Sequence, residues 1–121
     1  MLFNPTLLTR YDFMQISQTE TNLQIEILPL KKAATILRAI NHGLRQQIMQ
    51  LLHKHERMDV TTLYVKLRLE QSVASQHLAI LRKAGFVNAQ RDGKQVFYSV
   101  SYERLADVTN HAKALIQANK P

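Results

Sequence analysis

The stretch from residue 71 to residue 85, QSVASQHLAILRKAG, has the apolar spacing of a helix that buries one side. At about 100° per residue, Ala74, Leu78 and Leu81 fall on one side of such a helix, with His77 beside them. Any surface helix has a polar outer side, so this pattern alone does not indicate a function and the neighbouring segments must be considered. That outer side carries small and polar residues, namely Ser72, Gln76, Ala79 and Lys83, flanked by Ser75 and Arg82.

The outer side of this helix suits the major groove of DNA. Small serine and alanine side chains let a helix approach the base edges closely, and Gln76 offers both a donor and an acceptor to an adenine. Hydroxyl and basic side chains can bind phosphates. We therefore interpret residues 71–85 as a DNA recognition helix, and the inward His77 as a hydrogen-bonded packing residue.

The charge of the chain favours a polyanionic partner. Its 121 residues have room for one domain with a modest core, and they carry a formal net charge of +7. Residues 31–121 hold 15 basic against 6 acidic residues, whereas residues 1–30 hold one basic and three acidic residues. A basic body is typical of nucleic-acid binding, although basic surfaces also arise for solubility or for acidic membranes.

The chain contains no cysteine, which excludes disulfides, thiolate metal sites and thiol redox sensing. No apolar run approaches the roughly 20 residues that cross a bilayer. The amino terminus lacks the charged start and continuous apolar segment of a secretory signal. We expect a cytoplasmic protein without a membrane partner.

Residues 1–29 have a poor pattern, and we expect them to form a mobile leader before a domain that covers residues 30–121. Met14 could be the true start, with the preceding residues added by an upstream start choice. Leu23, Ile25 and Ile27 alternate with polar residues, as in a short strand. They could equally form an arm that packs on a partner subunit, and the pattern does not separate these alternatives.

Apolar residues recur at helical spacing in three segments before the recognition helix. Pro29 suits the first helical position of the first segment, and Asp59 suits the cap of the third. The third segment is short, and a brief link at residues 68–71 joins it to the recognition helix, which makes a helix-turn-helix pattern. The three expected helices cover residues 30–40, 44–52 and 60–67.

Asp92 and Gly93 lie between two runs that contain valine, phenylalanine and tyrosine. This arrangement is a strong hairpin signal, because glycine tolerates the positive φ of a tight primed turn. Arg91 and Lys94 flank the tip, where they could reach phosphates or the minor groove. We therefore predict a mainly α fold with a small β-hairpin: a winged helix-turn-helix with five helices and a two-stranded wing.

The fifth helix is expected over residues 102–119, and its apolar stripe exceeds what one small core needs. Together with the first helix, it is the candidate interface of a homodimer. The predicted interface residues are Leu30, Leu37, Leu105, Val108, Ala112, Leu115 and Ile116.

With these elements in place, the chain resembles the ArsR/SmtB family of dimeric winged-helix repressors. The matching text is AINHGLRQQIMQLL (residues 39–52), VTTLYVKLRLEQSVASQHLAILRKAGFV (60–87) and RDGKQVFYSV (91–100). The resemblance implies a homodimer on a double-stranded DNA operator with dyad symmetry, usually repressing. The motif and the outer helix side together give the predicted DNA contacts, which are Gln71, Ser72, Ser75, Gln76 and Lys83 on the helix, and Arg91, Lys94 and Gln95 on the wing.

Two metal sites known in the family lack their ligands in this chain. The Cys-x-Cys position of one site holds residues 58–61, MDVT, and the Asp/His positions of the other hold Tyr102, Arg104, Leu115 and Ala118. We read the remaining histidines as scattered surface or interfacial residues, so we predict no metal and no cofactor. The sequence does not decide what controls DNA binding: the alternatives are an organic ligand, a protein partner, the leader, or no inducer at all.

Two other functional classes compete with this interpretation. A winged helix can serve protein interaction without an operator, although the polar, non-aromatic outer helix side argues against that use. An enzyme is not expected, because the best group of candidate catalytic residues, His55, Glu56 and Asp59, has no nucleophile beside a base.

Overall fold

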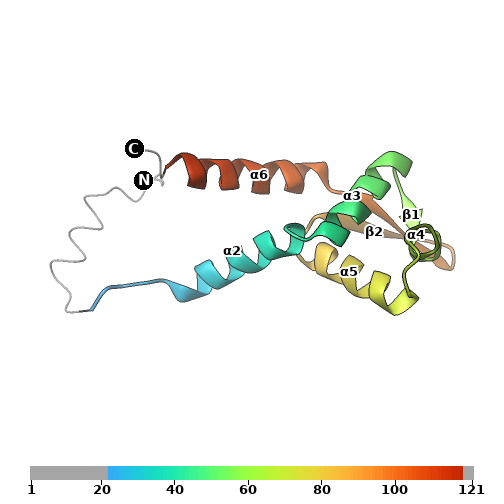
Figure 1. The fold of residues 1–121 in the computed structure, drawn as a ribbon, viewed down its shortest axis with the longest axis horizontal. Coiled ribbons are helices and arrows are strands. Elements are labelled where there is room, and N and C mark those ends of the chain that lie inside the picture. Colours follow the sequence, from blue (N-terminus) through green and yellow to red (C-terminus); the bar gives the residue numbers. More distant parts are fainter. Residues whose placement is uncertain (1–21, 119–121) are drawn as a thin grey trace. The chain divides into compact units, whose positions relative to one another are not determined.

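The computed structural model describes residues 22–118, and this part contains five helices and three strands (Figure 1). By its internal contacts the chain divides into residues 1–32 and residues 33–121. Met14 and most of the expected leader lie outside the described residues. No helix within residues 22–118 is long and apolar enough to span a membrane. The elements are α2 (Ile27–Ile40), α3 (Gly43–His55), β1 (Met58–Asp59), α4 (Val60–Leu67), α5 (Gln71–Lys83), β2 (Val87–Asp92), β3 (Gln95–Val100) and α6 (Tyr102–Gln117).

Helix α2 begins at Ile27, which is earlier than the sequence pattern predicted. Pro29 is tolerated there because the first N–H groups of a helix have no intrahelical partner. Residues 23–26 form neither helix nor strand. The strand alternative for the segment around Leu23 and Ile25 is therefore wrong, while the alternative of an arm stays a prediction.

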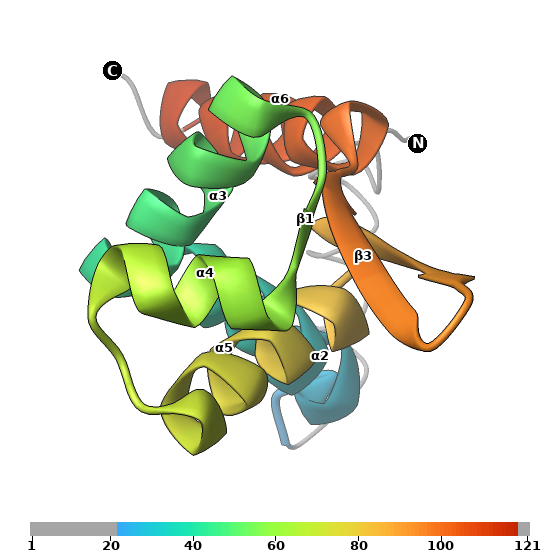
Figure 2. The same cartoon turned by 90° about the vertical axis from the view of Figure 1, so that its right-hand side faces the viewer.

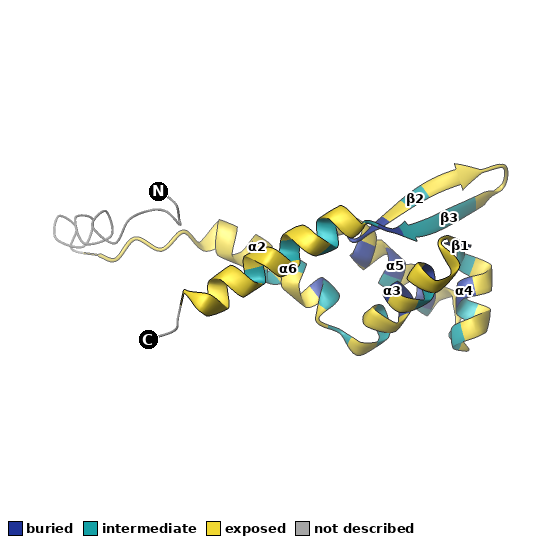
Figure 3. Cartoon of the chain, turned by 90° about the horizontal axis from the view of Figure 1, so that it is seen from above, coloured by how far each residue is buried: buried dark blue, intermediate teal, exposed yellow. Residues whose placement is uncertain are grey.

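The core of residues 33–121 lies between α3, α4, α5 and the base of the hairpin. Figure 2 shows α4 and α5 side by side, and Figure 3 shows buried residues on α3, α5 and the hairpin base. The largest fully buried side chains are Phe86, Ile48, Leu52, Leu63, Leu78 and Leu81. Their burial confirms the helical spacing read from the sequence and fixes which side of α5 faces outward.

The turn between α4 and α5 contains a non-glycine residue in the left-handed region, Arg68 at φ 56°. The Leu69 N–H donates to the Tyr64 carbonyl at 2.9 Å, and the Arg68 N–H donates to the Val65 carbonyl at 3.2 Å. These two bonds make a Schellman motif, which ends α4 and sets the direction in which the chain enters α5.

The hairpin gains a third strand that the sequence pattern did not predict. The strand β1 pairs antiparallel with β3, so the order of the sheet is β1-β3-β2. Asp59 does precede α4 with extended backbone, but its side chain makes no capping hydrogen bond. The turn of the hairpin is Gly93-Lys94, one residue later than the predicted Asp92-Gly93, because Asp92 still pairs with Gln95. Gly93 has φ 66°. Glycine at the first of two turn positions is the arrangement of a type II′ turn.

Helix α6 begins after Ser101, whose Oγ accepts from the Arg104 N–H at 3.4 Å. This bond satisfies one of the N–H groups that a helix start leaves without a partner. No residue of α6 is fully buried. Leu115 and Ile116 near its end are 69% and 66% exposed, which is unusual for large apolar side chains side by side.

Candidate nucleic-acid interface

The outer side of α5 is accessible over its whole length. Ala74, Leu78 and Leu81 point into the core on the opposite side, so the predicted division of this helix is confirmed. The helix starts after Glu70, so Ser72 is its second residue and does not cap it. The predicted contact residues on the helix, all exposed, are Gln71, Ser72, Ser75, Gln76 and Lys83.

The end of α5 is fixed by Gly85 and by a side chain from α6. Gly85 has φ 90°, and the Phe86 N–H donates to the Leu81 carbonyl at 2.9 Å, again as in a Schellman motif. The Arg104 Nε donates to the Ala84 carbonyl at 2.9 Å. A Cβ on Gly85 would lie 3.1 Å from that Nε, so the arginine approaches closely because this residue has no side chain.

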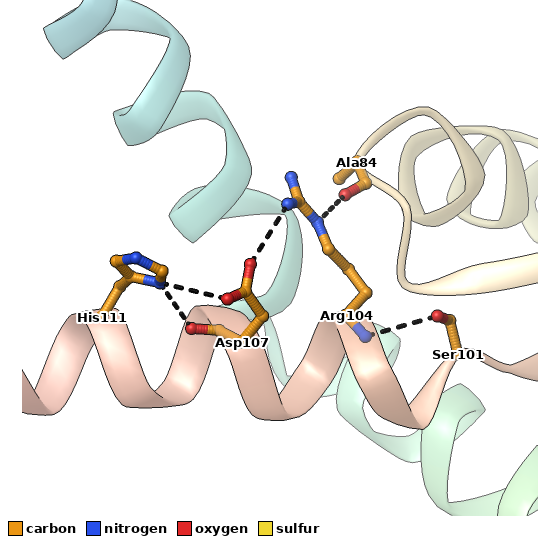
Figure 4. Close-up of polar contacts among 5 residues, drawn as sticks. All are labelled: Ala84, Ser101, Arg104, Asp107 and His111. Atoms are coloured by element: carbon orange, nitrogen blue, oxygen red, sulfur yellow. Dashed lines mark hydrogen bonds and ion pairs between the residues drawn. The ribbon is translucent and has the colours of Figure 1, made fainter.

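Figure 4 shows Arg104 between Ala84 on one side and Asp107 on the other. The Arg104 Nη1 lies 3.9 Å from the Asp107 carboxylate. His111 continues this row, with its Nδ1 donating to the Asp107 carbonyl at 2.7 Å and lying 3.5 Å from the Asp107 carboxylate. The contact between Arg104 and Ala84 joins residues 20 positions apart, so no local sequence pattern predicts it.

The inward His77 makes the hydrogen-bonded contact that its position predicted. The Arg45 Nη1 donates to His77 Nδ1 at 3.2 Å, and the His42 ring lies 5.1 Å from the His77 ring. The same guanidinium donates from Nε to the Ala39 carbonyl at 2.7 Å and from Nη2 to the Arg38 carbonyl at 3.2 Å. Burial, with the nearby Arg45 and His42, lowers the pKa of His77 below 6.5.

All three predicted contact residues of the wing are exposed, and one of them, Gln95, also has a hydrogen-bond partner within the chain. Arg91 and Lys94 are exposed. The Gln95 amide is also exposed, but its Nε2 donates to the Asp59 carboxylate at 3.4 Å. Gln95 therefore has an intramolecular partner that competes with its predicted role on DNA, and that partner comes from the strand β1 that the sequence pattern missed.

No group of three or more histidine, cysteine, aspartate or glutamate side chains could hold a metal ion within residues 22–118. His53 Nδ1 lies 2.7 Å from the Tyr102 hydroxyl. His111 lies beside Asp107, and a pair of ligands is fewer than a structural metal site uses.

An apolar groove of about 370 Å³ lies between the second half of α2 and α6. Several residues predicted for a dimer interface line it, including Leu37, Val108, Ala112 and Leu115. Val108 and Leu105 also pack partly against the core of their own chain. The remaining predicted interface residues, Leu30 and Ile116, are 60% and 66% exposed.

The comparisons with known proteins agree with this architecture. Residues 42–89, which cover α3 to the first part of β2, match the model of the family described as "Bacterial regulatory protein, arsR family". The transcriptional repressor PagR of Bacillus anthracis is 31% identical over 85 residues, which is 70% of this chain and 85% of PagR. Its crystal structure superposes with a TM-score of 0.55 at 29% identity, over 69% of this chain and 97% of the PagR chain.

Two further relatives have the same fold. The transcriptional activator HlyU of Vibrio cholerae is 41% identical over 70 residues, 58% of this chain and 64% of HlyU. Its structure gives a TM-score of 0.55 at 34% identity, over 72% of this chain and 95% of that chain. The crystal structure of NolR from Sinorhizobium fredii gives a TM-score of 0.57 at 34% identity, over 75% of this chain and 87% of the NolR chain. With its helix-turn-helix and wing matched in sequence and in structure, the chain belongs to the ArsR family of DNA-binding transcription regulators, which are not enzymes.

Proposed function

We propose that the chain acts as a homodimer that binds an operator with dyad symmetry and represses transcription from it. The observation that carries the proposal is the outer side of α5, where Ser72, Ser75 and Gln76 are all exposed. The amide of Gln76 can bond to the N6 and N7 of an adenine in the major groove. The hydroxyls of Ser72 and Ser75 can bind phosphates, which fixes the register of the helix.

The homodimer follows from the apolar surface of α2 and α6. Leu37 is 38% exposed and Leu115 is 69% exposed, and both line the groove between these helices. A second copy of the chain would remove this apolar surface from water, and a symmetric pair would present two recognition helices. Two such helices match an operator whose half-sites lie about 10 base pairs apart, or a multiple of that distance.

Repression is our proposal for the direction of regulation. PagR is named a repressor and HlyU an activator, so the relatives' names do not agree. Occupation of an operator by a helix-turn-helix dimer is enough to block access to the promoter, so repression needs no surface beyond the two proposed above. We propose that it works in the cytoplasm, where the chromosome lies, and we assign no inducer.

Selection of bound sequences from random double-stranded DNA tests the proposal. We expect enrichment of a dyad-symmetric sequence, together with a steep fall of affinity with salt because bound phosphates release counterions, at a slope of about −0.9 per phosphate. A winged helix that serves only protein interaction would enrich no sequence and would show a flat salt response. If a monomer enriches a single half-site, the proposal of a sequence-specific regulator stands and the proposal of a homodimer is wrong.

A further inference from the structure

Two side chains that flank Met58 reach the wing, one from the strand β1 and one from the residue before it. Met58 is buried in the core. Arg57 and Asp59 are its neighbours on either side, so they lie on the opposite, outer face of the sheet. In the register of the sheet Asp59 pairs with Phe97, and Gln95 lies two residues from Phe97 on the same face. The outer face of the wing is therefore next to the side chains of β1.

The guanidinium of Arg57 contacts the wing twice. Its central carbon lies 4.0 Å from the centre of the Phe97 ring. Its Nη2 lies 3.3 Å from the carboxylate of Asp92, the residue that precedes the turn. Gln95, the residue that follows the turn, donates to Asp59 at 3.4 Å. Both residues that flank the Gly93-Lys94 turn are thus held, Gln95 from β1 and Asp92 from the residue that precedes β1.

The pairing with Arg57 matters most for the charge of the wing tip. Residues 91–95 carry two basic side chains, Arg91 and Lys94, and one acidic side chain, Asp92. A bare carboxylate at this place would repel the phosphates that the two basic residues are expected to meet. The side chains of Arg57 and Asp92 are 50% and 64% exposed, so their pairing contributes little to folding in water. Its effect is expected when a phosphate backbone comes close.

We propose that Arg57 is a positioning residue for DNA binding. It holds the hairpin through Phe97 and neutralises Asp92, so that Arg91 and Lys94 can meet the phosphates. Arg57 acts through Asp92 and Phe97 and is not itself the phosphate contact. The inference rests on the proposed function, and it adds a residue that neither the sequence motif nor the predicted contacts include.

A double-mutant cycle tests the role of Arg57. The variants are Arg57→Met, Asp92→Asn and the two combined, measured by fluorescence anisotropy on the selected operator between about 50 and 200 mM salt. We expect Arg57→Met to weaken binding by about three- to tenfold. We expect Asp92→Asn to raise affinity several-fold more in the Arg57→Met background than in the wild type, because only there is the carboxylate uncovered. The combined variant should recover the wild-type salt slope and most of the lost affinity, and should keep only the part of the loss that comes from the missing Phe97 contact.

Two controls keep the result specific. Lys113→Met removes the same charge from an exposed position on α6 and should change affinity less than about twofold. Arg57→Lys keeps the charge but not the planar group, so we expect an intermediate loss through the Phe97 contact. Thermal unfolding of each variant should stay near that of the wild type, which separates a role on DNA from a role in folding.

Three results would overturn the inference. If the effects of Arg57→Met and Asp92→Asn are additive and the combined variant keeps a salt slope smaller by about 0.9, Arg57 binds a phosphate itself. If Arg57→Met behaves like Lys113→Met, the contact has no role on DNA. If the wild type binds no sequence selectively, both the proposed function and this inference are wrong. If it binds selectively but the effects of the two substitutions are additive, only this inference is wrong.

Discussion

Arg104 in the first turn of α6 donates from its Nε to the carbonyl oxygen of Ala84 at 2.9 Å, directly after the recognition helix α5. This bond connects the helix proposed for dimerisation to the helix proposed for DNA contact. Ala84 is buried, so water could replace the guanidinium only poorly. The position of α5 is therefore expected to depend on α6.

Removing this bond tests that dependence. Arg104→Met should lower the free energy of unfolding by about 1–3 kcal/mol, because a buried carbonyl loses its donor. It should also weaken operator binding. Asp107→Asn is the matched control, since the Arg104 Nη1 is 3.9 Å from a half-exposed carboxylate and such pairs contribute little. Urea unfolding and operator titration check both effects, and equal behaviour of the two variants would remove the role assigned to the bond.

A single substitution that introduces a charge on α6 tests the proposed dimer interface. Leu115→Asp places a carboxylate on the apolar groove, where dimerisation would have to bury it without a partner. We expect monomers that bind operator poorly. Lys113→Asp on the same helix does not line the groove and should stay dimeric. Light scattering separates the two states, and an intact dimer of the Leu115→Asp variant would place the interface elsewhere.

The pH dependence of stability should report the contact between Arg45 and His77. The pKa of His77 is lowered in the folded chain, so at a pH above 6.5 both the folded and the unfolded chain hold it neutral. As the pH falls through 6.5, the unfolded chain takes up this proton first and folding becomes less favourable. The loss ends only below the lowered pKa of the folded chain.

Urea unfolding between about pH 5 and 8 measures this effect, with His77→Gln as the reference that cannot take up the proton. The wild type should lose more stability than the variant as the pH falls below 6.5. Since the other four histidines are present in both proteins, their contribution cancels in the difference. Parallel pH profiles would show that His77 is as easily protonated in the folded chain as in the unfolded one.

The parts of the fold that were predictable from sequence are those specified by local patterns. The apolar spacing around Leu78 and Leu81 predicted the buried side of α5, and the Gly93 turn predicted the hairpin, because both signals lie within a few neighbouring residues. The strand β1 has only two residues, too few for an alternation to be visible. Its existence depends on pairing with β3, some 40 positions later.

The same distinction holds for the candidate site. The exposure of Ser75 and Gln76 follows from their place on an amphipathic helix, so these residues could be named in advance. The contacts of Arg57 with Asp92 and of Arg104 with Ala84 could not, because each joins residues 20 or more positions apart. Gln95 stays a predicted wing contact, and its bond to Asp59 could not be foreseen because the two residues lie 36 positions apart.

The most direct measurement of the central claim compares Gln76→Ala with the wild type on the selected operator and on random DNA. Binding of the operator should weaken by about 1–3 kcal/mol, while binding of random DNA should hardly change, because Gln76 is assigned to a base. Gln50→Ala, an exposed glutamine on α3, is the control and should alter neither. Equal losses on both DNAs, or no loss on the operator, would contradict the claim that this helix reads the sequence.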